Sequence, residues 1–294
     1  MAKKKEFSAK EAMKIAGAAA ANGEKDKAIK YYKAVLSKYP DNQDAIDGFQ
    51  SLHTNSLFQS DLDELKELLD RGEYRELEVR AKMYIELYPD VHELYSCAGI
   101  AVKAKGAFDE ALIYLKKAAE LNPTNPGAHY DLGEVYRELD DFDNALICYE
   151  KSIKINPAFV PGYNNAGNVY MLRGEYDRAV EFFRGAASRQ PNSAVILMNA
   201  AGALKAAGDY PSAIMHYHKV ISIDDTKAHV FLALAECEKL NGNPEEAKKI
   251  YDVVISQEPD NPAVLNAYSN FLRETGDIDE ADKLSARLEQ LKPQ

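Results

Sequence analysis

Apolar residues recur at steps of three and four along most of the chain, which is the spacing of one face of an α-helix. Tyr163, Ala166 and Tyr170 show this spacing, and so do Phe183 and Ala187. No segment of useful length alternates between apolar and polar residues with the period of two expected for a strand. The pattern therefore predicts antiparallel helices that are joined in pairs by short turns.

The same residue types return every 34 residues, and a fixed period of this kind is the signature of a repeat protein. Residues 1–8 precede the period as a basic tail, and residues 43–57 fall outside it. The repeat at 58–91 is the most divergent, because Asp61 and Glu64 stand at positions that are usually apolar. Position 32 is proline except at Asp225, and the eight repeats are then 9–42, 58–91, 92–125, 126–159, 160–193, 194–227, 228–261 and 262–294.

At three further positions, 15, 20 and 8, the residue type that recurs has a physical explanation. Position 15 is Gly except at Asp140, which suits a helix end that needs a positive φ. Position 20 is Ala except at Leu77, and position 8 is also small except at Leu65, as helices that cross closely require. Proline at position 32 stops the second helix. We expect rings to fill the space between helix pairs at position 17 (Tyr74, Phe108, Phe142, Tyr176, Tyr210) and position 24 (Tyr32, Tyr149, Phe183, Tyr217, Tyr251).

Residues 43–57 keep a helical pattern of their own. Ala45, Ile46 and Phe49 have helical spacing, which predicts an extra helix near 43–53 and then a turn over residues 54–56. Two interpretations stay open: a degenerate repeat that has lost its second helix, or a hinge that changes the direction of a groove.

These positions resemble the tetratricopeptide repeat family. The family pattern L-G-x-x-Y appears as Leu132-Gly133 with Tyr136. A close variant, with Ala in place of Leu, appears as Ala166-Gly167 with Tyr170. The chain departs from the family's frequent Trp at position 4, since it contains no Trp. The resemblance implies an all-α fold, an α-solenoid wound as a right-handed superhelix of about eight helix-turn-helix repeats, with an extra helix after the first.

The resemblance also implies that the first helix of each pair lines a concave groove, with positions 2, 5, 6, 9, 12 and 13 facing inward. A groove of this kind would bind a partner protein or an extended peptide. The candidate groove residues in the middle repeats are Tyr130, Asp131, Glu134, Arg137, Asn164, Asn165, Asn168, Met198, Asn199 and Lys205.

Within this set, Asp131, Asn165 and Asn199 share position 6 and should form a row. Amides both donate and accept hydrogen bonds, so such a row can pair with a peptide backbone of any sequence. It resembles the asparagine ladder of O-linked N-acetylglucosamine transferase repeats, although the plainer interpretation is that asparagine is a soluble residue on an exposed face. A carboxylate clamp for chaperone tails should be incomplete, because the positions where basic residues belong hold Asn164, His229 and Ala233.

The net charge of −11 repels phosphate backbones and argues against a nucleic-acid partner. It favours solubility, or a preference for basic partners. The chain has no apolar stretch long enough to span a membrane and no clear signal peptide, and its three cysteines are far apart. These features predict a cytoplasmic protein in a reducing compartment.

Catalytic chemistry is not indicated. The six histidines are scattered, and His216 and His218 lie two residues apart on a helix, where they point to different faces. Phosphate-loop, nucleophile-elbow and zinc-protease motifs are missing from the sequence. The pairs Asp140-Asp141 and Asp224-Asp225 fall at turns, where we expect them to cap helices. We therefore predict no enzyme activity, no cofactor and no metal site.

The function predicted from the sequence is that of an adaptor or scaffold for protein partners. Two alternatives remain at this point. The chain could be the recognition region of a larger enzyme, such as a glycosyltransferase or sulfotransferase. It could instead assemble with copies of itself into a homo-oligomer through its ends.

Overall fold

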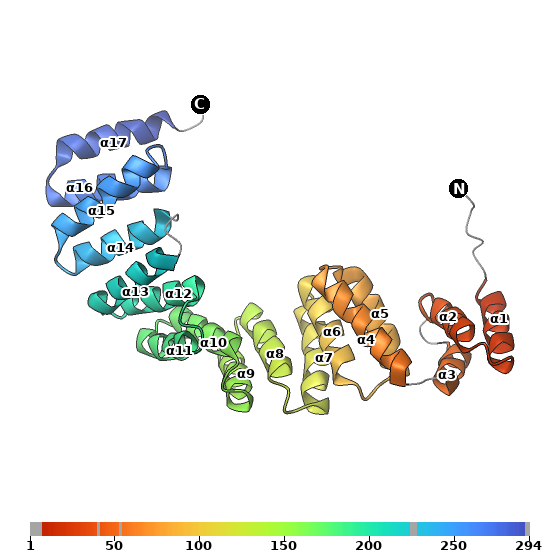
Figure 1. Cartoon of the computed structure of the whole chain (residues 1–294). Helices are drawn as coiled ribbons and strands as arrows, with labels where there is room; N and C mark the ends of the chain where they lie inside the picture. The colour runs from red at the N-terminus through yellow and green to blue at the C-terminus, as the bar shows by residue number, and fades with distance from the viewer. Residues whose placement is uncertain (1–7, 40–41, 53–54, 224–227, 292–294) are drawn as a thin grey trace. The chain divides into compact units, whose positions relative to one another are not determined.

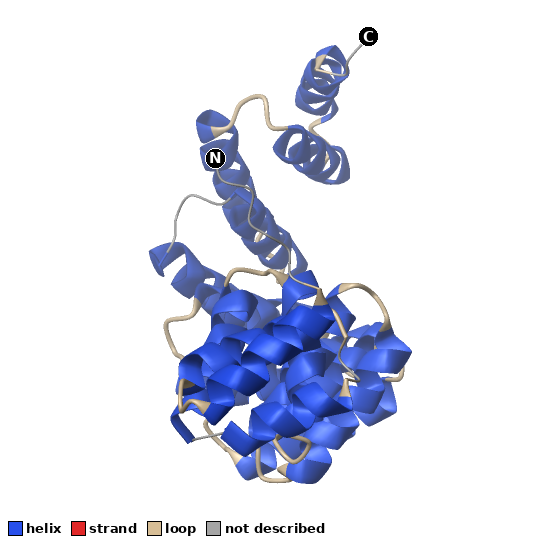
Figure 2. Ribbon diagram, turned by 90° about the vertical axis from the view of Figure 1, so that its right-hand side faces the viewer, coloured by secondary structure: helices blue, strands red, loops and turns tan. Residues whose placement is uncertain are grey.

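The computed structural model of the chain describes residues 8–39, 42–52, 55–223 and 228–291. In these ranges the chain forms seventeen α-helices and no strand, so the all-α prediction is confirmed (Figures 1 and 2). The helices belong to two compact units, Met1–Asn156 and Pro157–Gln294, called unit 1 and unit 2 below.

The helices come in consecutive pairs, with α3 as the extra helix. Within each unit, a helix packs mainly on the helices directly before and after it in the chain. Unit 1 contains α1 (Ala9–Ala21), α2 (Lys25–Leu36), α3 (Gln43–Leu52), α4 (Asn55–Asp70), α5 (Tyr74–Leu87), α6 (His92–Ala104), α7 (Phe108–Leu121), α8 (Pro126–Glu138) and α9 (Phe142–Ile155). Unit 2 contains α10 (Val160–Leu172), α11 (Tyr176–Arg189), α12 (Ala194–Ala206), α13 (Tyr210–Ile223), α14 (Ala228–Leu240), α15 (Pro244–Gln257), α16 (Pro262–Thr275) and α17 (Ile278–Gln290).

Each pair turns at a residue with left-handed backbone. The glycines of position 15 have φ between 69° and 94°. The residue after the glycine donates its N–H to the carbonyl five residues earlier, as Glu175 does to Tyr170 at 2.9 Å. This bond satisfies a carbonyl that the helix end would otherwise leave unpaired. Helices α5, α7, α9, α11 and α15 then end two residues before the proline of position 32.

Asp140 adopts the same backbone with φ 57°, and its neighbour Asp141 caps α9 by accepting a hydrogen bond from the Asn144 N–H at 3.2 Å. The capping expected of Asp141 is confirmed, whereas Asp140 makes the turn, and Asp224-Asp225 lies outside the described residues.

Asp140→Gly should raise the free energy of unfolding by about 1 kcal/mol, because a left-handed backbone costs a side-chain-bearing residue roughly that amount. Gly174→Ala, the reverse change at the equivalent turn, should lower it by about as much. Urea denaturation followed by circular dichroism measures both. A lower urea midpoint for Asp140→Gly would contradict this account of the turn.

The core is built where small residues meet rings. The alanines of position 20 are fully buried, and the rings of position 24 are at most 6% exposed. A Cβ atom added at Gly133 would lie 2.8 Å from Tyr149 Cε1, and one added at Gly167 would lie 2.8 Å from Phe183 Cε1. The small residue of position 8 therefore makes room for the ring of position 24 in the same pair, as ridges-into-grooves packing requires.

Position 17 differs from the prediction. Tyr74 and Tyr176 are each 38% exposed, and the rings of Phe108, Phe142 and Tyr210 are only partly buried. Position 17 is the first residue of each second helix, so its ring lies at the edge of the helix pair. These rings therefore fill the space between helix pairs only in part, with Phe108 packing against the core around Leu115.

The extra helix is confirmed as α3. Ala45 and Phe49 are fully buried, and α3 packs on α2 and α5. The turn predicted after it is wrong in two residues, because α4 begins at Asn55 and includes Ser56.

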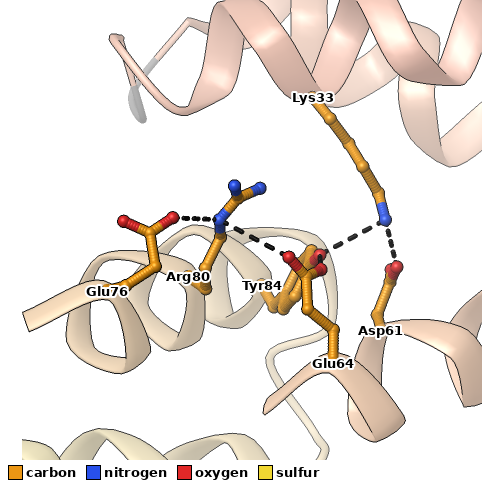
Figure 3. A network of polar contacts seen from close by, with 6 residues as sticks. All are labelled: Lys33, Asp61, Glu64, Glu76, Arg80 and Tyr84. Carbon is orange, nitrogen blue, oxygen red and sulfur yellow. Dashed lines mark hydrogen bonds and ion pairs between the residues drawn. The ribbon is translucent and has the colours of Figure 1, made fainter. Parts of the chain in front are cut away.

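The polar residues of the divergent repeat belong to a network that joins α2, α4 and α5 (Figure 3). The Lys33 ammonium pairs with the carboxylate of Asp61, which is only 1% exposed, and donates to the Tyr84 hydroxyl at 3.3 Å. Tyr84 in turn donates to Glu64 Oε2 at 2.5 Å, and Arg80 Nε lies 3.7 Å from Glu64 Oε1. Asp61 and Glu64 are therefore accommodated at positions that are usually apolar, because both carboxylates have hydrogen-bonding partners.

Candidate functional site

The candidate residues of unit 1 lie on α8, and a ring from α9 reaches them. Tyr149 is fully buried, yet its hydroxyl donates to Glu134 Oε1 at 2.5 Å. Arg137 Nε lies 3.6 Å from the same oxygen, and the Tyr130 ring centroid is 5.8 Å from that of Tyr149. Burial, and then the bond to Glu134, raises the pKa of Tyr149. The structure thus brings Tyr130, Glu134 and Arg137 together around one core tyrosine.

Asp131 is partly buried on the same helix, and its carboxylate has no hydrogen-bond partner among the residues that the structure describes. Burial raises the pKa of Asp131 to about 7, the charge of Lys103 opposes this rise and that of Glu134 adds to it. A carboxyl group whose pKa is raised by folding contributes stability at low pH, and this contribution is lost as the pH rises towards 7.

Asp131→Asn should therefore stabilise the protein at pH 8 by about 1–2 kcal/mol, allowing for screening by solvent. The gain should shrink as the pH is lowered towards 5, because the wild-type carboxyl is then protonated in the folded state. Urea denaturation at several pH values measures this, with Glu120→Gln on the exposed face of α7 as the control. A gain that does not depend on pH would contradict the assignment.

In unit 2 the candidate amides form a chain of hydrogen bonds between neighbouring first helices. Asn199 Nδ2 on α12 donates to Asn164 Oδ1 on α10 at 2.9 Å, and Asn164 Nδ2 donates to Asn165 Oδ1 at 3.2 Å. The predicted row thus also involves position 5, because Asn199 donates to Asn164, which in turn donates to Asn165. Asp131, the third member of that row, belongs to unit 1.

The remaining candidates of unit 2 are placed differently from one another. Asn168 is partly buried on α10, and Met198 packs against the hydrophobic core around Leu197. Lys205 on α12 pairs with Glu236 on α14 at 2.5 Å. Met198 thus contributes to packing, whereas Lys205 links two first helices.

A hollow of about 490 Å³ opens between the first helices α14 and α16. Its rim is polar and its base is apolar. On the rim, Lys239 pairs with Glu274 at 2.7 Å, so a second ion pair joins neighbouring first helices. The lining residues are His229, Leu232, Ala233, Glu236 and Lys239 on α14, Tyr251 on α15, and Asn266, Ala267, Asn270, Phe271 and Glu274 on α16.

From the sequence, Tyr251 is predicted only as a core ring, and Glu274 is not among the predicted groove residues. Glu274 could have been predicted as a groove residue, because position 13 is one of the positions expected to face inward. A role for the Tyr251 hydroxyl was indicated by the preference for Tyr over Phe at position 24. The hydroxyl of a tyrosine in a protein core usually has a hydrogen-bond partner or contacts solvent. Arg273, at position 12, turns away and donates to Asp282 Oδ1 on α17 at 2.8 Å.

His129 and the three cysteines take structural places in the described parts of the chain. His129 is 4% exposed, its Nε2 lies 3.0 Å from the Pro123 carbonyl, and burial lowers its pKa. Cys97, Cys148 and Cys237 are buried free thiols, and burial raises the pKa of each to about 11. No group of three or more His, Cys, Asp or Glu side chains in those parts is placed to hold a metal ion. His53 lies outside the described residues.

None of the helices in the described ranges is both long enough and apolar enough to cross a membrane.

Family models for repeats of one kind match most of the chain. Tetratricopeptide repeat models match residues 12–42, 126–159, 148–181, 204–268 and 240–294, and a TPR repeat model matches 99–140. No curated protein matches the chain.

Solved structures share the fold at low identity. PilF of Pseudomonas aeruginosa superposes with a TM-score of 0.61 and 16% identity, over 74% of this chain and 96% of that one. YrrB, described as a TPR protein with an unusual peptide-binding site, gives 0.57 and 20%, over 64% and 97%. MamA of Desulfovibrio magneticus RS-1 gives 0.53 and 20%, over 57% and 95%. With the helix pairs, their glycine turns and the family matches in agreement, the chain belongs to the tetratricopeptide repeat family.

Proposed function

We propose that this protein is an adaptor that holds an extended segment of a partner protein along the first helices of its repeats. Membership of the tetratricopeptide family supports a protein-interaction scaffold in general. The observation that carries the finer proposal is the composition of the first-helix faces in unit 2. Amides, carboxylates and ammonium groups gather there and bond from one first helix to the next.

A face of this composition can bind an extended peptide. The amides of Asn164, Asn165 and Asn199 can exchange their mutual bonds for bonds to a peptide backbone, which offers one donor and one acceptor at most residues. The hollow next to α14 provides room for a side chain. Backbone bonds give affinity and side-chain pockets give specificity in extended-peptide recognition.

Peptides selected from a random displayed library against the whole protein test the proposal. Affinity for a selected peptide, measured by fluorescence anisotropy, should fall tenfold or more in Asn164→Ala/Asn165→Ala/Asn199→Ala, because several hydrogen bonds of about 1 kcal/mol are lost. The matched control is Glu181→Ala/His218→Ala/Gln257→Ala, which changes exposed side chains on second helices of the same unit. Equal affinity in the amide variant and the control would overturn the proposal.

A further inference from the structure

We infer that the hollow between α14 and α16 receives a basic side chain, arginine or lysine, from the bound segment. The inference rests on the proposed function and adds the chemistry of the partner. It is carried by three features of the hollow: a tyrosine hydroxyl with no hydrogen-bond partner among the described residues, two carboxylates beside one ammonium group on the rim, and an aromatic base.

The hydroxyl is that of Tyr251. Its side chain is only 5% exposed and lines the hollow, yet the hydroxyl has no hydrogen-bond partner among the residues described. Burial, and then the charges of Glu236 and Glu274, raises the pKa of Tyr251 to about 12. Because Tyr251 lines the hollow, its hydroxyl can donate a hydrogen bond to a group bound there, or accept one from it.

The charges on the rim favour a cation. Two carboxylates, Glu236 and Glu274, face one ammonium group, that of Lys239, while Lys205 reaches Glu236 from α12, outside the hollow. The Glu236 and Glu274 side chains remain 48% and 58% exposed, and a carboxylate can accept several hydrogen bonds. Each can therefore accept a further donor beside its present lysine. An acidic side chain would meet both carboxylates and be repelled.

The base suits the stem of a long basic side chain. The rings of Tyr251 and Phe271 have centroids 5.1 Å apart, and Leu232 adds an aliphatic surface. Lysine and arginine bury their methylene stems on apolar surface, and their cationic heads interact favourably with ring faces. The side-chain oxygens of Asn266 and Asn270 provide further acceptors. Arginine matches the site best, because its five donors can be shared among several acceptors.

The test compares peptides selected on the wild-type protein with those selected on Glu236→Gln/Glu274→Gln. Wild-type peptides should share an arginine or lysine at one fixed place, and replacing that residue should weaken binding tenfold or more; citrulline replaces arginine as its neutral isostere, and norleucine replaces lysine. The same replacement should change the affinity of the double variant less than twofold. Glu181→Gln/Glu245→Gln removes the same charge from exposed second-helix positions and should retain the wild-type preference.

Tyr251→Phe supplies an independent measurement. Because the hydroxyl has no partner within the described protein, its removal should leave the urea midpoint unchanged while it weakens the basic peptide three- to tenfold. Selected peptides without a shared basic residue, or equal binding of the neutral peptide, would overturn the inference and leave the proposed function intact. Failure to select any peptide would count against the proposed function itself.

Discussion

Phe183→Ala should lower the free energy of unfolding by about 3–5 kcal/mol, as expected when a buried ring is replaced by a methyl group. The Phe183 side chain is 1% exposed and packs in the space that Gly167 leaves open. The cavity cannot close easily, because the neighbouring first and second helices hold the backbone apart. Urea denaturation measures the loss, and hydrogen exchange should show the lowest protection in α10 and α11.

Tyr176→Ala is the matched control. Tyr176 begins the same helix and has a ring of similar size, but it is 38% exposed. We expect a loss of less than about 1 kcal/mol, since surface substitutions seldom cost more. Similar losses for the two variants would contradict the view that position 24, rather than position 17, forms the core.

Lys33→Met should cost a comparable amount, about 3–5 kcal/mol at neutral pH. The substitution keeps the apolar stem of the side chain but leaves the carboxylate of Asp61, which is 1% exposed, without its cation. The double variant Lys33→Met/Asp61→Leu should recover much of the stability, because it removes the stranded charge as well. Urea denaturation of the single and double variants gives the coupling between the two residues.

The pH dependence of Lys33→Met provides a second measure. Burial raises the pKa of Asp61, and the bond and charge of Lys33 oppose that rise. Without Lys33 the pKa rises further, so the penalty of the variant should be largest above that pKa and fall as the pH is lowered towards 5. The control is Lys27→Met, which breaks an exposed pair with Glu24 and should change stability by less than about 0.5 kcal/mol. A penalty that is constant with pH would exclude Asp61 as its source.

The fold was predictable because its turns and close helix contacts each accept only a few residue types at a fixed position of the repeat. Only glycine or a tolerant residue such as Asp140 fits a left-handed turn, and only a small residue fits against a position 24 ring. The polar network around Asp61 was not predictable, because its partners come from α2 and α5, far away in the sequence. From sequence, an acid at an apolar position looks like a departure from the pattern.

The candidate site was predictable in part for the same reason. Position numbers indicate which residues share a face, but the bond from Asn199 to Asn164 depends on how α10 and α12 are offset. Position alone also did not indicate that Met198 packs on the core, which its long and flexible side chain allows from a groove position. The hollow at Tyr251 requires three helices together, so no single repeat of the sequence displays it.

Most packing within each unit is between helices that are close in the chain, and this has an evolutionary consequence. A segment of 34 residues can be gained or lost by gene duplication or deletion, and the surfaces on either side of the junction still match, since each presents the same small residues and rings. Substitutions in one repeat are likewise felt mainly by the adjoining ones. The family architecture can therefore change in length, and acquire new recognition positions, without redesign of an existing core.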